Sequence, residues 1–138
     1  MCWGIECGDG WYDLIDALCA DIQNEVDNEI RQQGYKIKRG DLKPEDALPE
    51  EDMQVVAVQV KEKFGGLRFY VSRETDRVAG MISMAESMSL RICETCGNPG
   101  RPNKQGWITT MCTTCRDAYE KKRAEARDEW ERRFAFKK

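Results

Sequence analysis

Two pairs of cysteines constrain this chain of 138 residues more than any other feature of its sequence. Cys93 and Cys96 form one C-x2-C pair, Cys112 and Cys115 form a second, and fifteen residues separate the pairs. Two residues between thiolates let both sulfurs of a pair reach one tetrahedral ion, and the long spacer lets the second pair close the other side. The spacing therefore predicts a metal site with these four cysteines as ligands.

The predicted metal is Zn²⁺ in a structural role. Four thiolate ligands fill the tetrahedral shell and leave no open position for a water molecule or a substrate. The chain has no histidine, which excludes Ser-His-Asp and Cys-His nucleophiles and His-ligated zinc hydrolases. A redox-active C-x-x-C pair is the alternative, but such pairs usually begin a helix in a β-α-β context, which the sequence lacks. We therefore expect no enzyme activity.

Three further cysteines have no predicted place in the metal site. Cys19 lies in the apolar stretch of the first predicted helix and is expected to be a small buried side chain. Cys7 is expected either to join the core or to pair with Cys2 under oxidation. Because no apolar run approaches the roughly 20 residues that span a bilayer, and residues 1–6 lack signal-peptide features, we expect a cytoplasmic location and no membrane contact.

The first predicted helix is acidic and amphipathic. Apolar residues from Trp11 to Ile30 recur at spacings of three and four, which predicts a helix over about residues 10–33. Asp9 is placed to cap this helix and Gly34 is placed to end it. The first 30 residues contain eight acids and no lysine or arginine.

A β-hairpin is predicted to follow. The segment 53–61 is rich in β-branched residues and alternates in the manner of a strand. One face of that strand is predicted to hold Val56, Val58 and Val60. A turn at Gly65-Gly66 then leads into a returning strand over residues 67–71.

The second half of the chain is predicted to contain a helix over residues 74–90, the cysteine module with a strand at 106–110, and a charged helix over residues 114–135. The fold class is therefore α+β: an N-terminal helix packed on a small antiparallel sheet or hairpin, a second helix, a four-cysteine zinc module and a C-terminal helix. Residues 1–92, 93–116 and 117–138 are expected to form these three parts of one compact unit.

Charge divides the chain into opposed halves. Residues 1–92 hold 11 basic and 18 acidic side chains, net −7, whereas residues 93–138 hold 11 and 7, net +4. The acids predicted to oppose the apolar stripe of the first helix are Asp13, Asp16 and Asp27 and, further round, Asp21, Glu25 and Glu29. They form either an ordinary solvated face or an anionic surface that docks on a basic site of another protein.

The C-terminal helix offers a second candidate surface. The residues that can share one side of it are Tyr119, Ala126, Trp130 and Phe134, with Phe136 following. Either this side packs against the domain, or the helix projects and presents Trp130 and Phe134 to a partner or to a second copy of the chain. The apolar stripe is sparse, which favours the second alternative.

Two alternative functions involve nucleic acid. A zinc module followed by a basic helix commonly binds phosphates, and Arg101, Lys104 and Arg116 are the residues with which to test such a regulator. The net charge of −3 and the acids within each basic cluster disfavour it. A carboxylate-dependent nuclease would need Asp52 and Lys61 on neighbouring strands, but both fall on one predicted strand.

Three segments carry a resemblance to known proteins: ECGDGW at 6–11, VKEKFGGLRFY at 60–70, and the cysteine pairs with Gly106-Trp107 between them. Together they resemble a group of small zinc-binding proteins of bacteriophages, prophages and bacterial genomes. The resemblance covers most of residues 5–116 and implies a viral or mobile-element setting, without an established activity. In that setting, short acidic proteins frequently bind and block a host protein, including antiviral defence complexes.

We therefore predict a non-enzymatic, phage-encoded zinc protein that binds a host protein or protein complex and inhibits or modulates it. The predicted contact residues are Asp13, Asp16, Asp27, Trp130 and Phe134. A homodimer through the C-terminal helix is the other protein contact considered.

Overall fold

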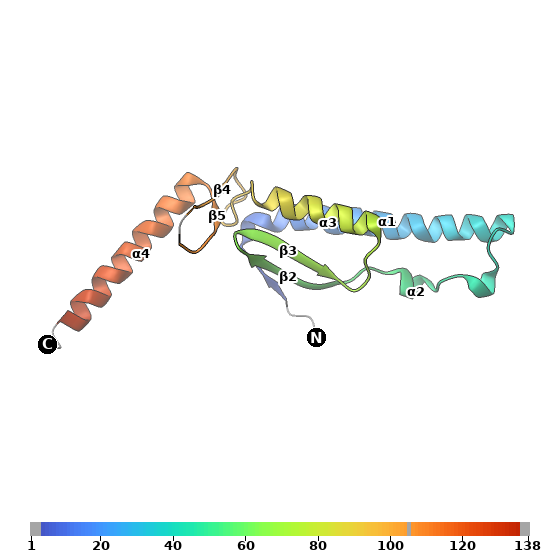
Figure 1. Ribbon diagram of the computed structural model, residues 1–138, viewed down its shortest axis with the longest axis horizontal. Helices are drawn as coiled ribbons and strands as arrows, with labels where there is room; N and C mark the ends of the chain where they lie inside the picture. Colours follow the sequence, from blue (N-terminus) through green and yellow to red (C-terminus); the bar gives the residue numbers. More distant parts are fainter. Residues whose placement is uncertain (1–3, 105, 136–138) are drawn as a thin grey trace.

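The computed structural model describes residues 4–104 and 106–135, which form the predicted α+β fold (Figure 1). In chain order the elements are β1 (Ile5–Glu6), the 3₁₀ turn η1 (Asp9–Trp11), α1 (Tyr12–Arg39), the 3₁₀ turn η2 (Pro44–Asp46), α2 (Glu50–Met53), β2 (Ala57–Lys63), β3 (Gly66–Val71), α3 (Asp76–Ser89), β4 (Arg101–Pro102), β5 (Thr110–Met111) and α4 (Thr113–Phe134). The main sheet has the order β1-β2-β3 and is mixed, because β1 pairs parallel with β2 while β2 and β3 are antiparallel.

The hydrophobic core lies between this sheet and the helices α1 and α3, which run side by side (Figure 1). Its buried members are Trp11, Ile15, Leu18, Ile22, Val60, Leu67, Phe69, Val78, Ile82 and Ala85. The α1 members recur at spacings of three and four, as the amphipathic pattern predicted.

Helix α1 begins and ends at other residues than predicted. Asp9 opens the 3₁₀ turn instead of capping the helix, so that Trp11 occupies the cap position without a side-chain cap bond. Gly34 lies inside the helix, since a single interior glycine costs only about 1 kcal/mol relative to alanine. The helix ends at Gly40, whose φ of 78° is the left-handed conformation typical of a helix stop.

A β-bulge in β2 overturns the predicted valine face. The register shifts between Ala57 and Gln59, which leaves Val58 as an extra residue. Ala57 before the bulge and Val60 after it both contact the core, whereas Val58 is exposed. The prediction that Val56, Val58 and Val60 share one face is wrong, because one inserted residue exchanges the two faces of a strand.

The hairpin turn lies one residue earlier than predicted. Phe64 and Gly65 form it, with φ values of 53° and 78°, and Gly66 already pairs with Lys63 in the sheet. Two successive positive φ values are typical of a type I′ turn, whose twist matches that of the flanking strands.

Side chains of α3 accept hydrogen bonds from the backbone N–H groups on the outer edge of β3. The Leu67 N–H donates to Ser89 Oγ over 2.9 Å, and the Phe69 N–H donates to Glu86 Oε1 over 3.1 Å. Ser89 is fully buried, and its hydroxyl donates to the Glu86 carbonyl over 2.6 Å. A helix thus replaces the missing neighbouring strand, which fixes α3 along the sheet.

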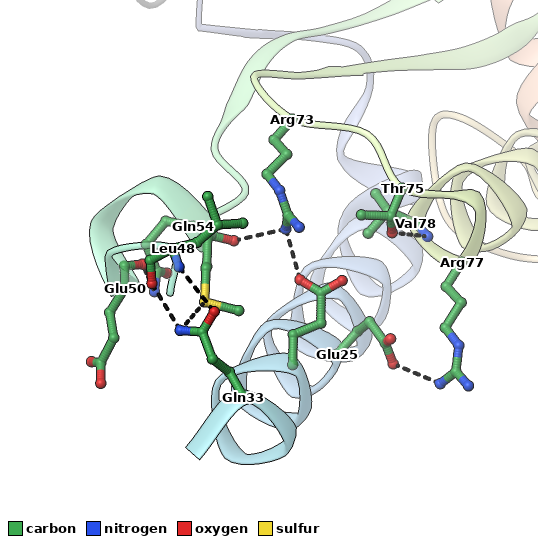
Figure 2. A network of polar contacts seen from close by, with 11 residues as sticks. Glu25, Gln33, Leu48, Glu50, Gln54, Arg73, Thr75, Arg77 and Val78 are labelled. Atoms are coloured by element: carbon green, nitrogen blue, oxygen red, sulfur yellow. Dashed lines mark hydrogen bonds and ion pairs between the residues drawn. The ribbon is translucent and has the colours of Figure 1, made fainter. Parts of the chain in front are cut away.

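Two acids of α1 that were predicted to face solvent hold α1 to the segment around α3 (Figure 2). Arg73 contacts the Glu29 carboxylate at 2.8 Å, and Arg77 contacts that of Glu25 at 3.2 Å. The prediction that Glu25 and Glu29 oppose the apolar stripe is wrong, because each follows a buried residue of that stripe by three positions and therefore shares its face.

Helix α4 extends away from the sheet and from α1 and α3 (Figure 1). None of its residues is buried. Its bounds agree with the prediction within one residue. In the part of the chain that the structure describes, no helix combines the length and the apolar character needed to cross a membrane.

We expect Ser89→Ala to lower the free energy of unfolding by about 1–3 kcal/mol, because it leaves the buried Leu67 N–H without an acceptor. The control is Ser87→Ala on the exposed side of the same helix, with an expected change within about 0.5 kcal/mol. Urea denaturation measures both, and equal stability of the two variants would contradict the edge-closing role of Ser89.

Candidate metal centre

The two cysteine pairs lie together in space, as their spacing predicted. The sulfurs of Cys93, Cys96, Cys112 and Cys115 all lie within 4.8 Å of one another. The four side chains are free thiols, and the sulfurs of Cys96 and Cys112 are 3.6 Å apart. Tetrahedral metal–thiolate bonds of about 2.3 Å place sulfurs about 3.8 Å apart. The four cysteines can therefore hold one metal ion.

The first pair lies in a tight turn after α3. The Cys93 N–H donates to the Asn98 carbonyl over 2.7 Å, and the Gly97 N–H donates to the Cys93 carbonyl over 2.9 Å. Gly97 has a φ of 76°, which side chains rarely adopt. The glycine directly after the pair thus lets the chain reverse and brings Cys96 back toward Cys93.

The second pair lies where the β4-β5 ribbon meets α4. Cys112 is the N-cap of the helix, and its sulfur accepts the N–H of Cys115 over 3.4 Å. Both sulfurs therefore lie at the positive end of the helix, which favours thiolates. The strand predicted at 106–110 is mostly wrong, because only Thr110 of that segment belongs to β5.

The thiols of the cluster ionise unequally. Burial opposes ionisation of Cys93, but backbone N–H groups, those of Cys112 and Cys96 foremost, outweigh it and lower the pKa of Cys93 to about 6. Hydrogen bonds with the sulfurs of Cys96 and Cys112 raise the pKa of Cys115 to about 12. Sulfurs this close cannot all carry a negative charge unless a cation lies among them. This donor set therefore fits a metal ion.

The first cysteine turn is docked on the segment that precedes α1. The indole N–H of Trp11, whose ring is fully buried, donates to the Ile92 carbonyl over 2.9 Å. The Gly10 N–H donates to the Glu94 carbonyl over 2.8 Å, and the Gly8 N–H donates to Glu94 Oε1 over 3.0 Å. The metal site is thereby joined to the core at residues more than 80 positions away in the chain.

Gly10 touches the cysteine turn backbone to backbone. A Cβ atom at Gly10 would lie 2.6 Å from the nitrogen of Gly97 and 2.7 Å from that of Cys96, which real Cβ atoms do not approach. This contact was not predicted from the sequence, in which residues 7–10 indicate only a turn before the first helix. The two glycines of the segment Gly8-Asp9-Gly10 before Trp11 were the available signal, since close backbone approach is a common reason for glycine.

A second contact joins the metal module to the hairpin. Thr110 is fully buried, and its hydroxyl donates to the Gly65 carbonyl over 2.6 Å. The Thr110 carbonyl accepts the Glu94 N–H over 2.9 Å. The chain before Cys112 is therefore held on both sides, by the hairpin and by the first cysteine turn.

The predicted partner-binding residues belong to two separate surfaces. Asp13, Asp16 and Asp27 are exposed on α1, on the side away from its buried stripe. Trp130 and Phe134 are exposed on α4, with ring centroids 5.0 Å apart. The two helices diverge from the metal module (Figure 1), so these five residues do not form one site.

The other cysteines differ from the prediction in part. Cys19 is exposed instead of buried, because it lies one position round the helix from the inward-facing Leu18. Cys7 is half-buried and packs against the core, one of the two predicted alternatives. Its predicted pairing partner Cys2 lies outside the described residues. Burial, then Glu94, raises the pKa of the Cys7 thiol.

Among residues 4–104 and 106–135, the four cysteines are the one group of three or more metal-ligating side chains that lie together. The prediction that Asp52 and Lys61 fall on one strand is wrong, because Asp52 lies in α2 and Lys61 in β2. A scan of protein-family models and searches of curated proteins and of solved structures found no match to this chain. The resemblance to phage and bacterial proteins therefore stays a prediction.

We expect the purified protein to hold about one metal ion per chain. Cys93→Ser combined with Cys112→Ser removes one ligand from each pair and should abolish binding, whereas Cys19→Ser, which changes an exposed thiol outside the cluster, should leave it intact. Elemental analysis and a thiol-competition titration measure the content. Retention of the ion by the double variant would contradict this ligand set.

We expect Gly10→Ala to lower the free energy of unfolding by about 1–3 kcal/mol, because the added methyl group pushes the cysteine turn off the core. It should also speed the loss of metal to a chelator. Gly34→Ala is the control, since its Cβ meets nothing within 4 Å and should stabilise the helix by about 0.5–1 kcal/mol. Equal metal-release rates in the two variants would contradict the docking role.

Proposed function

We propose that this is a non-enzymatic binding protein in which a structural zinc ion holds α4 in place and α4 docks on a partner protein. The observation that carries the proposal is the exposure of a 22-residue helix with no buried residue and with aromatic side chains at its far end. Zinc is the proposed metal because four thiolates are its typical structural ligand set.

Helical spacing separates the charges of α4. Residues three, four and seven apart share a face of a helix. Up to Phe134, the residues at these spacings from Trp130 are Arg123, Ala126, Arg127, Arg133 and Phe134. None of them is acidic. Together with Trp130 they form what we call the basic-aromatic face of α4.

The basic-aromatic face has the chemistry of a protein contact. Trp130 is 62% exposed and Phe134 is 43% exposed, although the two rings contact each other at an interplanar angle of 40°. Burying such side chains against a partner contributes about 1.5–3 kcal/mol each, and tryptophan and arginine are enriched among the residues that dominate interfaces. The expected partner surface is apolar at its centre and acidic at its rim.

The setting implied by the resemblance directs the search for a partner. If the chain is phage-encoded, a host protein or protein complex, such as an antiviral defence system, is the first candidate. Binding through α4 would then inhibit or modulate it. Asp13, Asp16 and Asp27 offer a second contact on α1, which suits a basic surface of the same complex.

Nucleic-acid binding is the second candidate, and one groove favours it. Arg101, Lys104 and Arg116 line a groove of about 580 Å³ between the β4-β5 ribbon and the start of α4. Glu120 lines the same groove, and Arg116 already donates to the Arg101 carbonyl over 2.9 Å. Both features weaken the cationic surface on which phosphate binding depends. Salt-sensitive gel shifts that require the three basic residues would favour this function.

We expect Arg127→Glu combined with Arg133→Glu to weaken partner capture at least about tenfold, because both charges flank Trp130. Lys121→Glu combined with Arg132→Glu makes the same change of net charge on the opposite side of α4 and should capture the partner as the unchanged protein does. Quantitative affinity purification from host lysate compares the three. A specific partner bound equally by both double variants would contradict docking through this face.

A further inference from the structure

We propose that the basic-aromatic face of α4 binds a groove between α1 and α3 of a second copy of the chain, and that the exchange is reciprocal. The inference rests on the proposed docking role of α4 and names its partner. It starts from an apolar groove on the two helices whose residues are Leu14, Ala17, Leu18, Asp21, Gly80, Met81, Met84, Ala85 and Met88, with a volume of about 370 Å³.

The lining of the groove is suited to large apolar side chains. Met84 is 65% exposed and Met88 is 41% exposed, although both lie beside the core helix α1. Methionine side chains are flexible and make favourable contacts with aromatic rings, so they suit Trp130 and Phe134. The span from Gly80 to Met88 rises about 12 Å along α3, which accommodates the two turns of α4 that carry the aromatic pair.

The glycine at position 80 is a second reason to expect another helix in the groove. It lies in the interior of α3, where glycine costs about 1 kcal/mol relative to alanine. A Cβ atom at Gly80 would meet nothing within 4 Å, so packing within the described chain does not require the missing side chain. Ala17 lines the opposite wall. Small residues on both walls let another helix approach closely.

Charge fits the same partner. Asp21 is the one charged residue among those that line the groove. Within the described residues it forms no ion pair, unlike Glu25 and Glu29. The arginines that flank Trp130 therefore meet an acid and no cation at this groove.

The contact is made between copies because of the direction of α4. Cys112 and Cys115 start the helix at the metal centre, and Arg116 ties its first turn to the ribbon through the Arg101 carbonyl. Figure 1 shows that the helix then leads its aromatic end away from the α1 and α3 of its own chain. Two chains that exchange α4 helices bury both surfaces and close a symmetric dimer. The predicted contact residues Asp13, Asp16 and Asp27 do not line this groove.

The test uses two variants that each damage one side of the contact. Arg127→Glu with Arg133→Glu changes α4, and Met84→Arg places a cation in the groove at an exposed position. Ser83→Arg adds the same charge to an exposed position of α3 outside the groove lining and serves as the control. Analytical ultracentrifugation gives the oligomeric state, with circular dichroism as the check on folding.

We expect the unchanged chain and Ser83→Arg to dimerise in the micromolar range, and each damaged variant to weaken the dimer at least about tenfold. An equimolar mixture of the two damaged variants should form a heterodimer, because it recreates one intact contact. A monomeric unchanged chain overturns the exchange but leaves docking on another protein standing. A dimer that survives Met84→Arg, or a mixture that does not rescue, also overturns it and assigns α4 to another surface, such as a second α4.

Discussion

The contact between Trp11, Gly10 and the first cysteine turn is the interaction on which the rest of the structure depends. It joins the start of α1 to the metal centre through the Ile92 and Glu94 carbonyls, 2.9 and 2.8 Å from their donors. A metal module of this size has little core of its own, so its orientation comes from the surface to which it is docked. The same tryptophan fills the core between sheet and helices. One side chain thus couples the position of the metal site to the packing of the whole domain.

The direction of α4 follows from that coupling. The second cysteine pair starts the helix, and the segment before it is held by Thr110 against the hairpin and the first cysteine turn. Without a cation among the four sulfurs, thiolates repel one another and protonated thiols form only weak hydrogen bonds, so the cluster no longer fixes both pairs. Loss of the metal would therefore release α4 while the α1, α3 and sheet packing keeps its own core. In the proposed function, a structural ion at this site would serve to place the surface of α4.

Sequence reasoning succeeded where the determinant is local. The cysteine spacing predicted the cluster, apolar periodicity predicted α1, β-branched residues with a glycine turn predicted the hairpin, and the charged C-terminal segment was predicted to be a helix, because each depends on residues near one another in the chain. It failed where a distant contact decides. Glu25 and Glu29 are the exception, since their three-residue spacing from the buried Ile22 and Val26 is a local signal. The bulge at Val58, which reverses a strand face, has no such signal. The closeness of Gly10 to Gly97 likewise has no counterpart in local pattern.

Charged residues that are neighbours in the sequence also lie on different faces of α4 in the structure. Along the chain, Glu129 and Glu131 directly flank Trp130 and alternate with the nearby arginines. On a helix, adjacent residues point in different directions, so these acids leave the face on which Arg127 and Arg133 accompany the aromatic pair. The net charge of −3 is a sum over the whole chain and therefore does not represent the local charge of either helix surface. An acidic α1 and a locally basic face of α4 in one chain support the proposed contact between copies, and the direction of α4 from the metal centre is what would make that contact intermolecular.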